Sequence, residues 1–93
     1  MKTYAQRHLL SLSREIAEAT AELRMLHDRL HQEASTLDDL RLRMLIAETP
    51  QADRDFHVAA AAVDRVRRRI LSLEAELRSL RAGQARLVRE QPG

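Results

Sequence analysis

Residues 63–80 read VDRVRRRILSLEAELRSL, a stretch in which an apolar residue returns every third or fourth position. These positions are Val63, Val66, Ile70, Leu73, Leu77 and Leu80, and the residues between them are mainly charged. Steps that alternate between three and four average 3.5 residues, which is the heptad repeat of helices that coil around each other. The stretch therefore predicts a long helix with one apolar seam.

The same repeat extends through both halves of the chain. In the first half its core positions are Leu9, Leu12, Ile16, Ala19, Leu23, Leu26, Leu30, Glu33, Leu37, Leu40, Met44 and Ala47. In the second half they are Phe56, Ala59, Val63, Val66, Ile70, Leu73, Leu77, Leu80, Gln84 and Leu87. Only Glu33 and Gln84 are polar. The repeat thus predicts two long amphipathic helices.

A short connection separates the two helices. Thr49 followed by Pro50 is typical of a helix N-cap and the first helical residue, and Pro50 disfavours helical geometry at Thr49. Thr3 with Gln6 three residues later matches a capping box at the start of the first helix. We therefore predict a helix over 4–47, a turn over 48–50 and a helix over 51–88. Because short connections join antiparallel neighbours, the fold class is all-α, with residues 1–93 forming a single antiparallel coiled-coil hairpin.

The two seams also suggest how the helices pair. Placing Ala47 opposite Phe56 puts an apolar residue opposite an apolar residue along most of the hairpin, as far as Ile16 opposite Leu87. In this register Glu33 faces Ile70, where Arg67 or Arg69 could reach its carboxylate. A polar residue in a coiled-coil core often specifies the register at some cost in stability.

Composition restricts the function. With 93 residues, two aromatic residues and no cysteine, the chain leaves no room for a walled catalytic cleft and offers no thiol for disulfides or zinc. His27 and His31 have a spacing that could bind a metal, but no convincing third ligand accompanies them. We therefore expect no enzyme activity, no cofactor and no metal site. The polar N-terminal stretch predicts neither a signal peptide nor a membrane span, so a cytoplasmic location is expected.

Several apolar residues lie outside the seam near the connection. They are Leu42, Leu45, Ile46 and Val58, with the small residues Ala61 and Ala62 beside them. Clustered apolar residues on a surface are typical of a partner-binding site, and small residues let a second helix approach closely. Scattered surface leucines are common, however, which is the competing interpretation. The partner could be another protein or a second copy, and two copies would form a four-helix bundle.

A run of arginines begins in the middle of the second helix, at Arg65, Arg67, Arg68 and Arg69. Such a face could bind phosphate groups in a salt-dependent way. No aromatic residue accompanies it for base stacking, and the net charge of the chain is only +2. A solvated helix face explains the same residues, so nucleic acid is not the expected partner.

The second half also contains a family resemblance. Phe56, His57 and Ala59, then Arg69-Ile70, then Leu73-Glu74-Ala75 with Leu77, resemble the returning helix of the Gre transcript-cleavage factors. The resemblance covers about a quarter of the chain.

The resemblance implies a hairpin that enters the secondary channel of RNA polymerase and presents acidic residues at its tip. The tip acids available here are Glu48, Asp53 and Asp55. The chain departs from the family at the tip itself, because the positions of the two family acids fall on Thr49 and Ala52. The C-terminal domain of the family is also absent from these residues. The resemblance therefore implies transcription regulation through occlusion or competition rather than stimulated cleavage.

Taken together, these features predict a non-enzymatic protein–protein interaction module, such as an adaptor, chaperone or regulator. A Gre-like polymerase regulator is the first alternative, and phosphate-backbone binding by the arginine-rich helix is the second.

Overall fold

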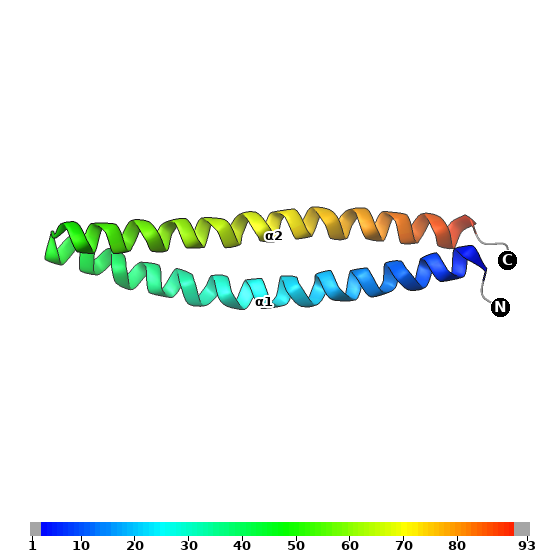
Figure 1. The fold of residues 1–93 in the computed structure, drawn as a ribbon, viewed down its shortest axis with the longest axis horizontal. Coiled ribbons are helices and arrows are strands. Elements are labelled where there is room, and N and C mark those ends of the chain that lie inside the picture. The colour runs from blue at the N-terminus through cyan, green and yellow to red at the C-terminus, as the bar shows by residue number, and fades with distance from the viewer. Residues whose placement is uncertain (1–2, 91–93) are drawn as a thin grey trace. The chain divides into compact units, whose positions relative to one another are not determined.

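The structure, a computed structural model, describes residues 3–90 and confirms the all-α hairpin. It contains two helices, α1 from Tyr4 to Ala47 and α2 from Pro50 to Glu90, and no strand among the described residues (Figure 1). Helix α2 begins one residue earlier and ends two residues later than the predicted 51–88. Residues 1–2 and 91–93, which the predicted hairpin includes, lie outside the described range.

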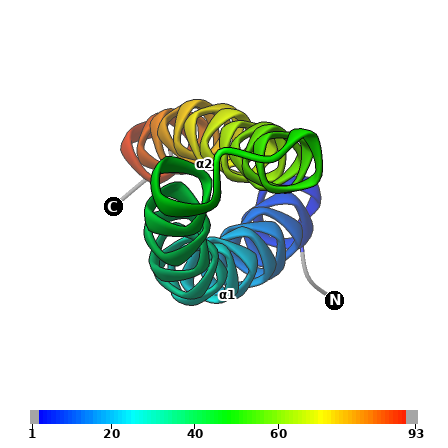
Figure 2. The same cartoon turned by 90° about the vertical axis from the view of Figure 1, so that its left-hand side faces the viewer.

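Three local devices set the helix ends. At the start of α1, the Thr3 N–H donates to Gln6 Oε1 (2.8 Å) and the Gln6 N–H donates to Thr3 Oγ1 (3.1 Å), which confirms the capping box. At its end, Glu48 has a φ of 52° and donates its N–H to the Met44 carbonyl (3.1 Å). This is the left-handed cap that commonly ends a helix. The Ala52 N–H donates to Thr49 Oγ1 (3.2 Å), so Thr49 caps α2. Figure 2 shows the resulting tight connection from α1 to α2.

The chain divides into two compact units, each built from a segment of both helices. The tip unit comprises residues 25–71 and includes the connection. The open-end unit comprises residues 1–24 and 72–93, of which 3–24 and 72–90 are described. Within the tip unit, α1 and α2 lie side by side up to the green connection of Figure 1. Within the open-end unit, the two helices are joined where Gln84 of α2 donates to Ser13 of α1.

The core of each unit is the predicted seam. All buried residues in the described range 3–90 belong to it except Ala52, which lies four residues before Phe56 and extends the repeat by one step. Val63 and Leu73 are the most deeply buried large side chains. Ala47, the last predicted seam residue of α1, is exposed. The seam residues of α1 are mostly half-buried. The core of this hairpin therefore covers the seam of α2 more completely than the seam of α1.

The predicted pairing of the seams is wrong by about one heptad. In the open-end unit, a Cβ on Gly83 would lie 3.9 Å from Leu12 Cδ1, and Gln84 Nε2 donates to Ser13 Oγ (3.2 Å). In the tip unit, Glu33 lines a groove with Thr36, Ala59 and Ala62. The residues of α2 that lie near Glu33 therefore precede its predicted partner Ile70 in the sequence. The connection occupies only Glu48 and Thr49, so residues equally distant from it lie at the same level. The seam pattern alone does not distinguish registers that differ by one heptad, because apolar positions repeat at that interval.

The heptad assigns every residue to a face. We name Leu9 and Phe56 as position a of the heptad in their helices. The residues that line each groove then show which heptad positions share a side of the hairpin. Thr20, Leu23, Glu74, Leu77, Arg78 and Arg81, at positions e, a and b, line one groove within the open-end unit. Glu33, Thr36, Ala59 and Ala62, at positions d and g, line another within the tip unit. We call the surface of positions b and e the b/e face and that of positions c and g the c/g face; position f lies opposite the seam.

Candidate interaction surfaces

The strongest apolar surface is at the end of α1 in the tip unit. Leu42, Leu45 and Ile46 are 60 %, 61 % and 81 % exposed, respectively. Their spacing of i, i+3 and i+4 places them together on one side of the helix, at positions f, b and c. The last turns of α1 therefore carry apolar side chains both toward the seam and away from it. We call Leu42, Leu45 and Ile46 the tip cluster.

The other predicted surface residues do not all join the tip cluster. Val58 is 70 % exposed and lies on the c/g face of α2. Ala62 is half-buried on the same face, in the groove of about 200 Å³ that Glu33, Thr36 and Ala59 complete. Ala61 is exposed at position f, on the outer side of α2. The six predicted residues are thus spread over three sides of the tip unit.

Glu33 is a seam residue with an incomplete set of partners. Arg29, one turn earlier in α1, donates from Nε to Glu33 Oε1 at 2.9 Å. The second oxygen, Oε2, is buried and has no hydrogen-bond partner. Arg29 therefore takes the place that the sequence analysis gave to Arg67 or Arg69 at Oε1. A buried carboxylate oxygen without a donor costs stability.

The three tip acids diverge. Asp53, at position e, lies 3.5 Å from His57 Nε2 through Oδ1, an ion pair only when the histidine is protonated. Asp55, at position g, accepts a hydrogen bond from Gln51 Nε2 at 2.7 Å. Glu48 forms the left-handed cap of α1. Because positions e and g belong to opposite faces, Asp53 and Asp55 are not brought together.

The two positions that the Gre resemblance aligns with acids have structural roles. Thr49 caps α2 through its hydroxyl oxygen, and Ala52 is buried in the seam. A carboxylate at position 52 would therefore be placed in the core.

The arginine run is also divided between faces. Arg67 lies on the b/e face, Arg65 and Arg69 lie on the c/g face, and Arg68 lies at position f. All four are exposed. The run consequently surrounds most of the helix and does not form one basic surface.

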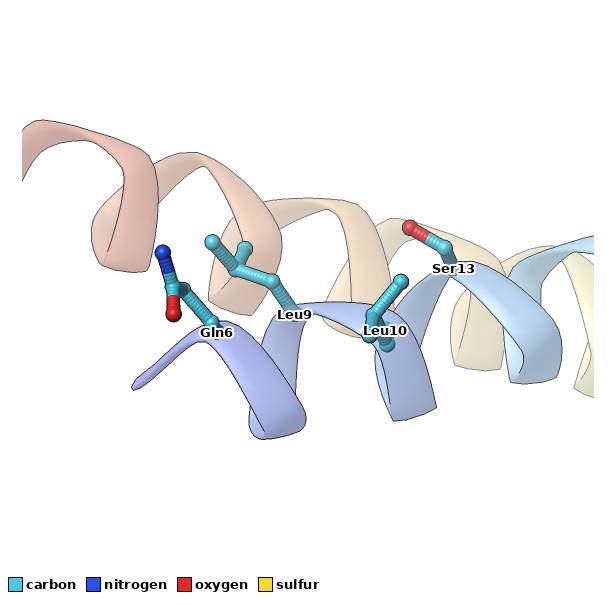
Figure 3. Close-up of a pocket in the computed structure, with 4 residues that line it drawn as sticks. All are labelled: Gln6, Leu9, Leu10 and Ser13. Carbon is cyan, nitrogen blue, oxygen red and sulfur yellow. The ribbon is translucent and has the colours of Figure 1, made fainter. Parts of the chain in front are cut away.

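The open-end unit has surfaces that the sequence analysis did not assign. Gln6, Leu9, Leu10 and Ser13 line a groove of about 310 Å³, and Figure 3 shows their side chains on α1 with Leu9 extending toward α2. The groove lined by Thr20, Leu23, Glu74, Leu77, Arg78 and Arg81 also has about 310 Å³. Both grooves lie on the b/e face. The sequence signal that could have identified this surface is a pair of apolar residues outside the seam, Leu10 at position b and Val88 at position e, which are both exposed.

The described residues show neither a metal centre nor a membrane span. Within residues 3–90, no three side chains of His, Cys, Asp or Glu gather closely enough to hold a metal ion. Neither α1 nor α2 has a stretch in the described range that is long and apolar enough to cross a membrane.

Comparison with protein-family models, with curated proteins and with solved structures gives no match for this chain. The surfaces of the two units are therefore the basis for a functional assignment.

Proposed function

We propose that the chain is a non-enzymatic interaction module that binds a protein partner through the tip cluster. The observation that supports this proposal is the exposure of Leu42, Leu45 and Ile46 on adjacent turns of a helix whose opposite side already packs in the seam. Contiguous exposed apolar side chains of this kind mark surfaces that a partner covers. The proposed site of action is the cytoplasm, as the sequence analysis expects.

The tip cluster suits a helical partner. An amphipathic helix can bind apolar residues spaced at i, i+3 and i+4 with its own apolar stripe. Arg41 and Arg43 flank the cluster and would add polar contacts at its rim.

The test is differential capture of partners from a cell lysate. The immobilised chain is compared with Leu42→Glu/Ile46→Glu, which places two charges in the tip cluster, and with Met25→Glu. Met25 is 72 % exposed but isolated, so its variant is the matched control for an added surface charge. We expect at least one protein to be retained by the wild-type chain and by Met25→Glu and to be lost from the double variant. Identical capture by all three chains would refute the proposal.

A Gre-like regulator of RNA polymerase is the second candidate. It is supported by the resemblance along α2 and by the exposure of Glu48 and Asp53 beside the connection. This candidate predicts that the chain co-elutes with core RNA polymerase and that Asp53→Ala/Asp55→Ala loses the complex. Absence of co-elution at micromolar concentration would remove it.

Phosphate-backbone binding is the third candidate, and the division of Arg65, Arg67 and Arg69 between two faces weakens it. It predicts binding to duplex DNA that falls steeply between low and physiological salt, with little dependence on sequence.

A further inference from the structure

The b/e face of the open-end unit is basic. Its charged residues are Arg24, Arg78 and Arg81 against Glu74, and the three arginines are exposed. Arg78, Arg81 and Glu74 line the groove of about 310 Å³ that includes Leu23 and Leu77. This face thus combines a groove that has apolar lining residues with an excess of positive charge.

The b/e face of the tip unit has the opposite sign. Asp38, Asp53 and Asp64 lie on it, and all three are exposed. Arg41 and Arg67 are its basic residues, so acids are in excess. The remaining titratable residues of this face are His27, His31 and His57.

The charges that distinguish the two faces are mostly unused within the chain. Among residues 3–90, Arg24, Arg78 and Arg81 make no hydrogen bond or ion pair, and neither do Asp38 and Asp64. The c/g face differs, because Asp55 is bonded by Gln51 and Arg29 is bonded to the seam residue Glu33. The b/e face therefore has charges available for an external partner.

Each b/e face also has an apolar residue at its outer end. In the open-end unit this is Leu10, beside the groove of Leu9, Gln6 and Ser13 (Figure 3). In the tip unit it is Leu45. In the tip unit, Asp53 lies near the level of Leu45, because both are close to the connection, and Asp38 lies about two helical turns inward from Leu45 on the same helix. Each face thus combines an apolar outer residue with charges, and the sign of the charges differs between the two faces.

We propose that the b/e face binds a second copy of this chain in antiparallel orientation, with the open-end unit of one copy on the tip unit of the other. Arg24, Arg78 and Arg81 meet the acidic face of Asp38, Asp53 and Asp64, and Leu45 inserts at the groove of Leu9 and Leu10. By two-fold symmetry each contact occurs twice. A parallel pair would instead oppose like charges in both units, which is unfavourable. The product is a four-helix bundle.

This inference shares Leu45 with the proposed function but otherwise concerns a different face. Leu42 and Ile46 lie at positions f and c, outside the b/e face. The variant Leu42→Glu/Ile46→Glu should therefore dimerise like the wild-type chain even where it loses another partner. If it loses a partner while the charge variants below dimerise normally, the proposed function stands and the inference fails.

The first experiment measures the mass of the full chain by light scattering over a concentration series. We expect the mass to rise from 10.7 kDa toward twice that value, and to fall again as salt is added. A mass of 10.7 kDa at every concentration up to about 0.5 mM at low salt would overturn the inference.

The second experiment exchanges charges between two variants. Arg78→Glu/Arg81→Glu makes both b/e faces acidic, and Asp38→Arg/Asp64→Arg makes both basic. We expect each variant alone to dimerise roughly tenfold or more weakly than the wild-type chain, because like charges then oppose each other. A mixture of the two should form a one-to-one heterodimer at least as tight as the wild-type pair. The exposed positions should leave helicity unchanged, which circular dichroism checks. Wild-type dimerisation of either variant alone, or no heterodimer in the mixture, would overturn the inference.

The third experiment determines the orientation, and it is simple because the chain has no cysteine. Single-cysteine chains Leu10→Cys and Leu45→Cys are oxidised separately and as a mixture. The antiparallel pair predicts a mixed disulfide between the two different chains, identified by mass spectrometry. Disulfides formed mainly within each separate sample would indicate a parallel pair and overturn the orientation proposed here.

Discussion

The two units of this hairpin each contain one polar residue in the seam, and they accommodate it differently. In the open-end unit, Gln84 donates its amide to Ser13 on the facing helix at 3.2 Å. In the tip unit, Glu33 is bonded on one oxygen by Arg29 of its own helix, and its other oxygen is buried without a partner. The polar seam residue thus links the two helices in the open-end unit, whereas in the tip unit its bond stays within one helix.

The units also differ in how their ends are held. The tip unit is closed by a two-residue connection with a cap on each side, at Glu48 and Thr49. The described part of the open-end unit contains no such connection, and the bond from Gln84 to Ser13 joins its helices there. A covalent turn lowers the entropy cost of pairing nearby segments. Because the turn fixes the register of the tip unit, that unit tolerates the cost of Glu33.

The largest expected effect tests how far the open-end unit depends on its seam. Leu73 is 1 % exposed, and Leu73→Ala should lower the free energy of unfolding by about 2–5 kcal/mol because it leaves a cavity. Thermal or urea unfolding followed by circular dichroism measures the change. Leu71→Ala is the matched control, since Leu71 is two residues away but 66 % exposed, and it should change stability by less than about 0.5 kcal/mol. Equal effects of the two substitutions would contradict the assigned seam.

The next effect concerns the unpartnered oxygen of the tip unit. Glu33→Leu should raise the free energy of unfolding by about 1–3 kcal/mol, because an apolar side chain replaces a partly desolvated carboxylate. Gln84→Leu is the comparison in the open-end unit. It should gain less, since it also removes the bond to Ser13. Urea unfolding of both variants gives the two changes in the free energy of unfolding. A larger gain for Gln84→Leu than for Glu33→Leu would contradict the prediction that Glu33 is the more costly seam residue.

The left-handed cap of the tip unit gives a third prediction. Glu48 has a positive φ, which costs a residue with a Cβ about 1–2 kcal/mol relative to glycine. Glu48→Gly should therefore stabilise the hairpin by about 1 kcal/mol. Glu48→Ala keeps a Cβ and serves as the control for loss of the carboxylate. If alanine stabilises as much as glycine, the gain comes from removing charge and the backbone argument fails.

The smallest predicted effect lies in the open-end unit. Gly83 is in the interior of α2, where a Cβ would make ordinary contact with Leu12 at 3.9 Å. Gly83→Ala should raise the free energy of unfolding by up to about 1 kcal/mol, the difference in helix propensity. The measurement is again urea unfolding, with Ala82→Gly, one residue away and exposed, as the reverse control. A loss of stability in Gly83→Ala would mean that the helices approach more closely at this level than the described contact.

Much of this structure could be predicted from local sequence signals. The seam residues, the capping box of Thr3 and Gln6, and the cap at Thr49 follow from residue types at short spacing. The tip cluster was also predictable, because Leu42, Leu45 and Ile46 are apolar residues outside the seam that are spaced at i, i+3 and i+4. What could not be predicted was which of the off-seam residues share a face. Ala62 lines a groove with Glu33 and Thr36 of the other helix, whereas Ala61, one residue earlier, is exposed at position f.

The sequence by itself determined the two helices and their seams, because a heptad repeat depends only on the spacing of apolar side chains along one chain. Only the tertiary structure decided the register between the seams. Shifting one helix by a heptad pairs apolar residues almost as well, so side-chain type does not distinguish the two arrangements. The connection of Glu48 and Thr49 does, since a turn this short places Leu12 beside Gly83 and Glu33 beside Ala59. That register also assembled the grooves of the b/e face, which the helices would line differently in any other pairing.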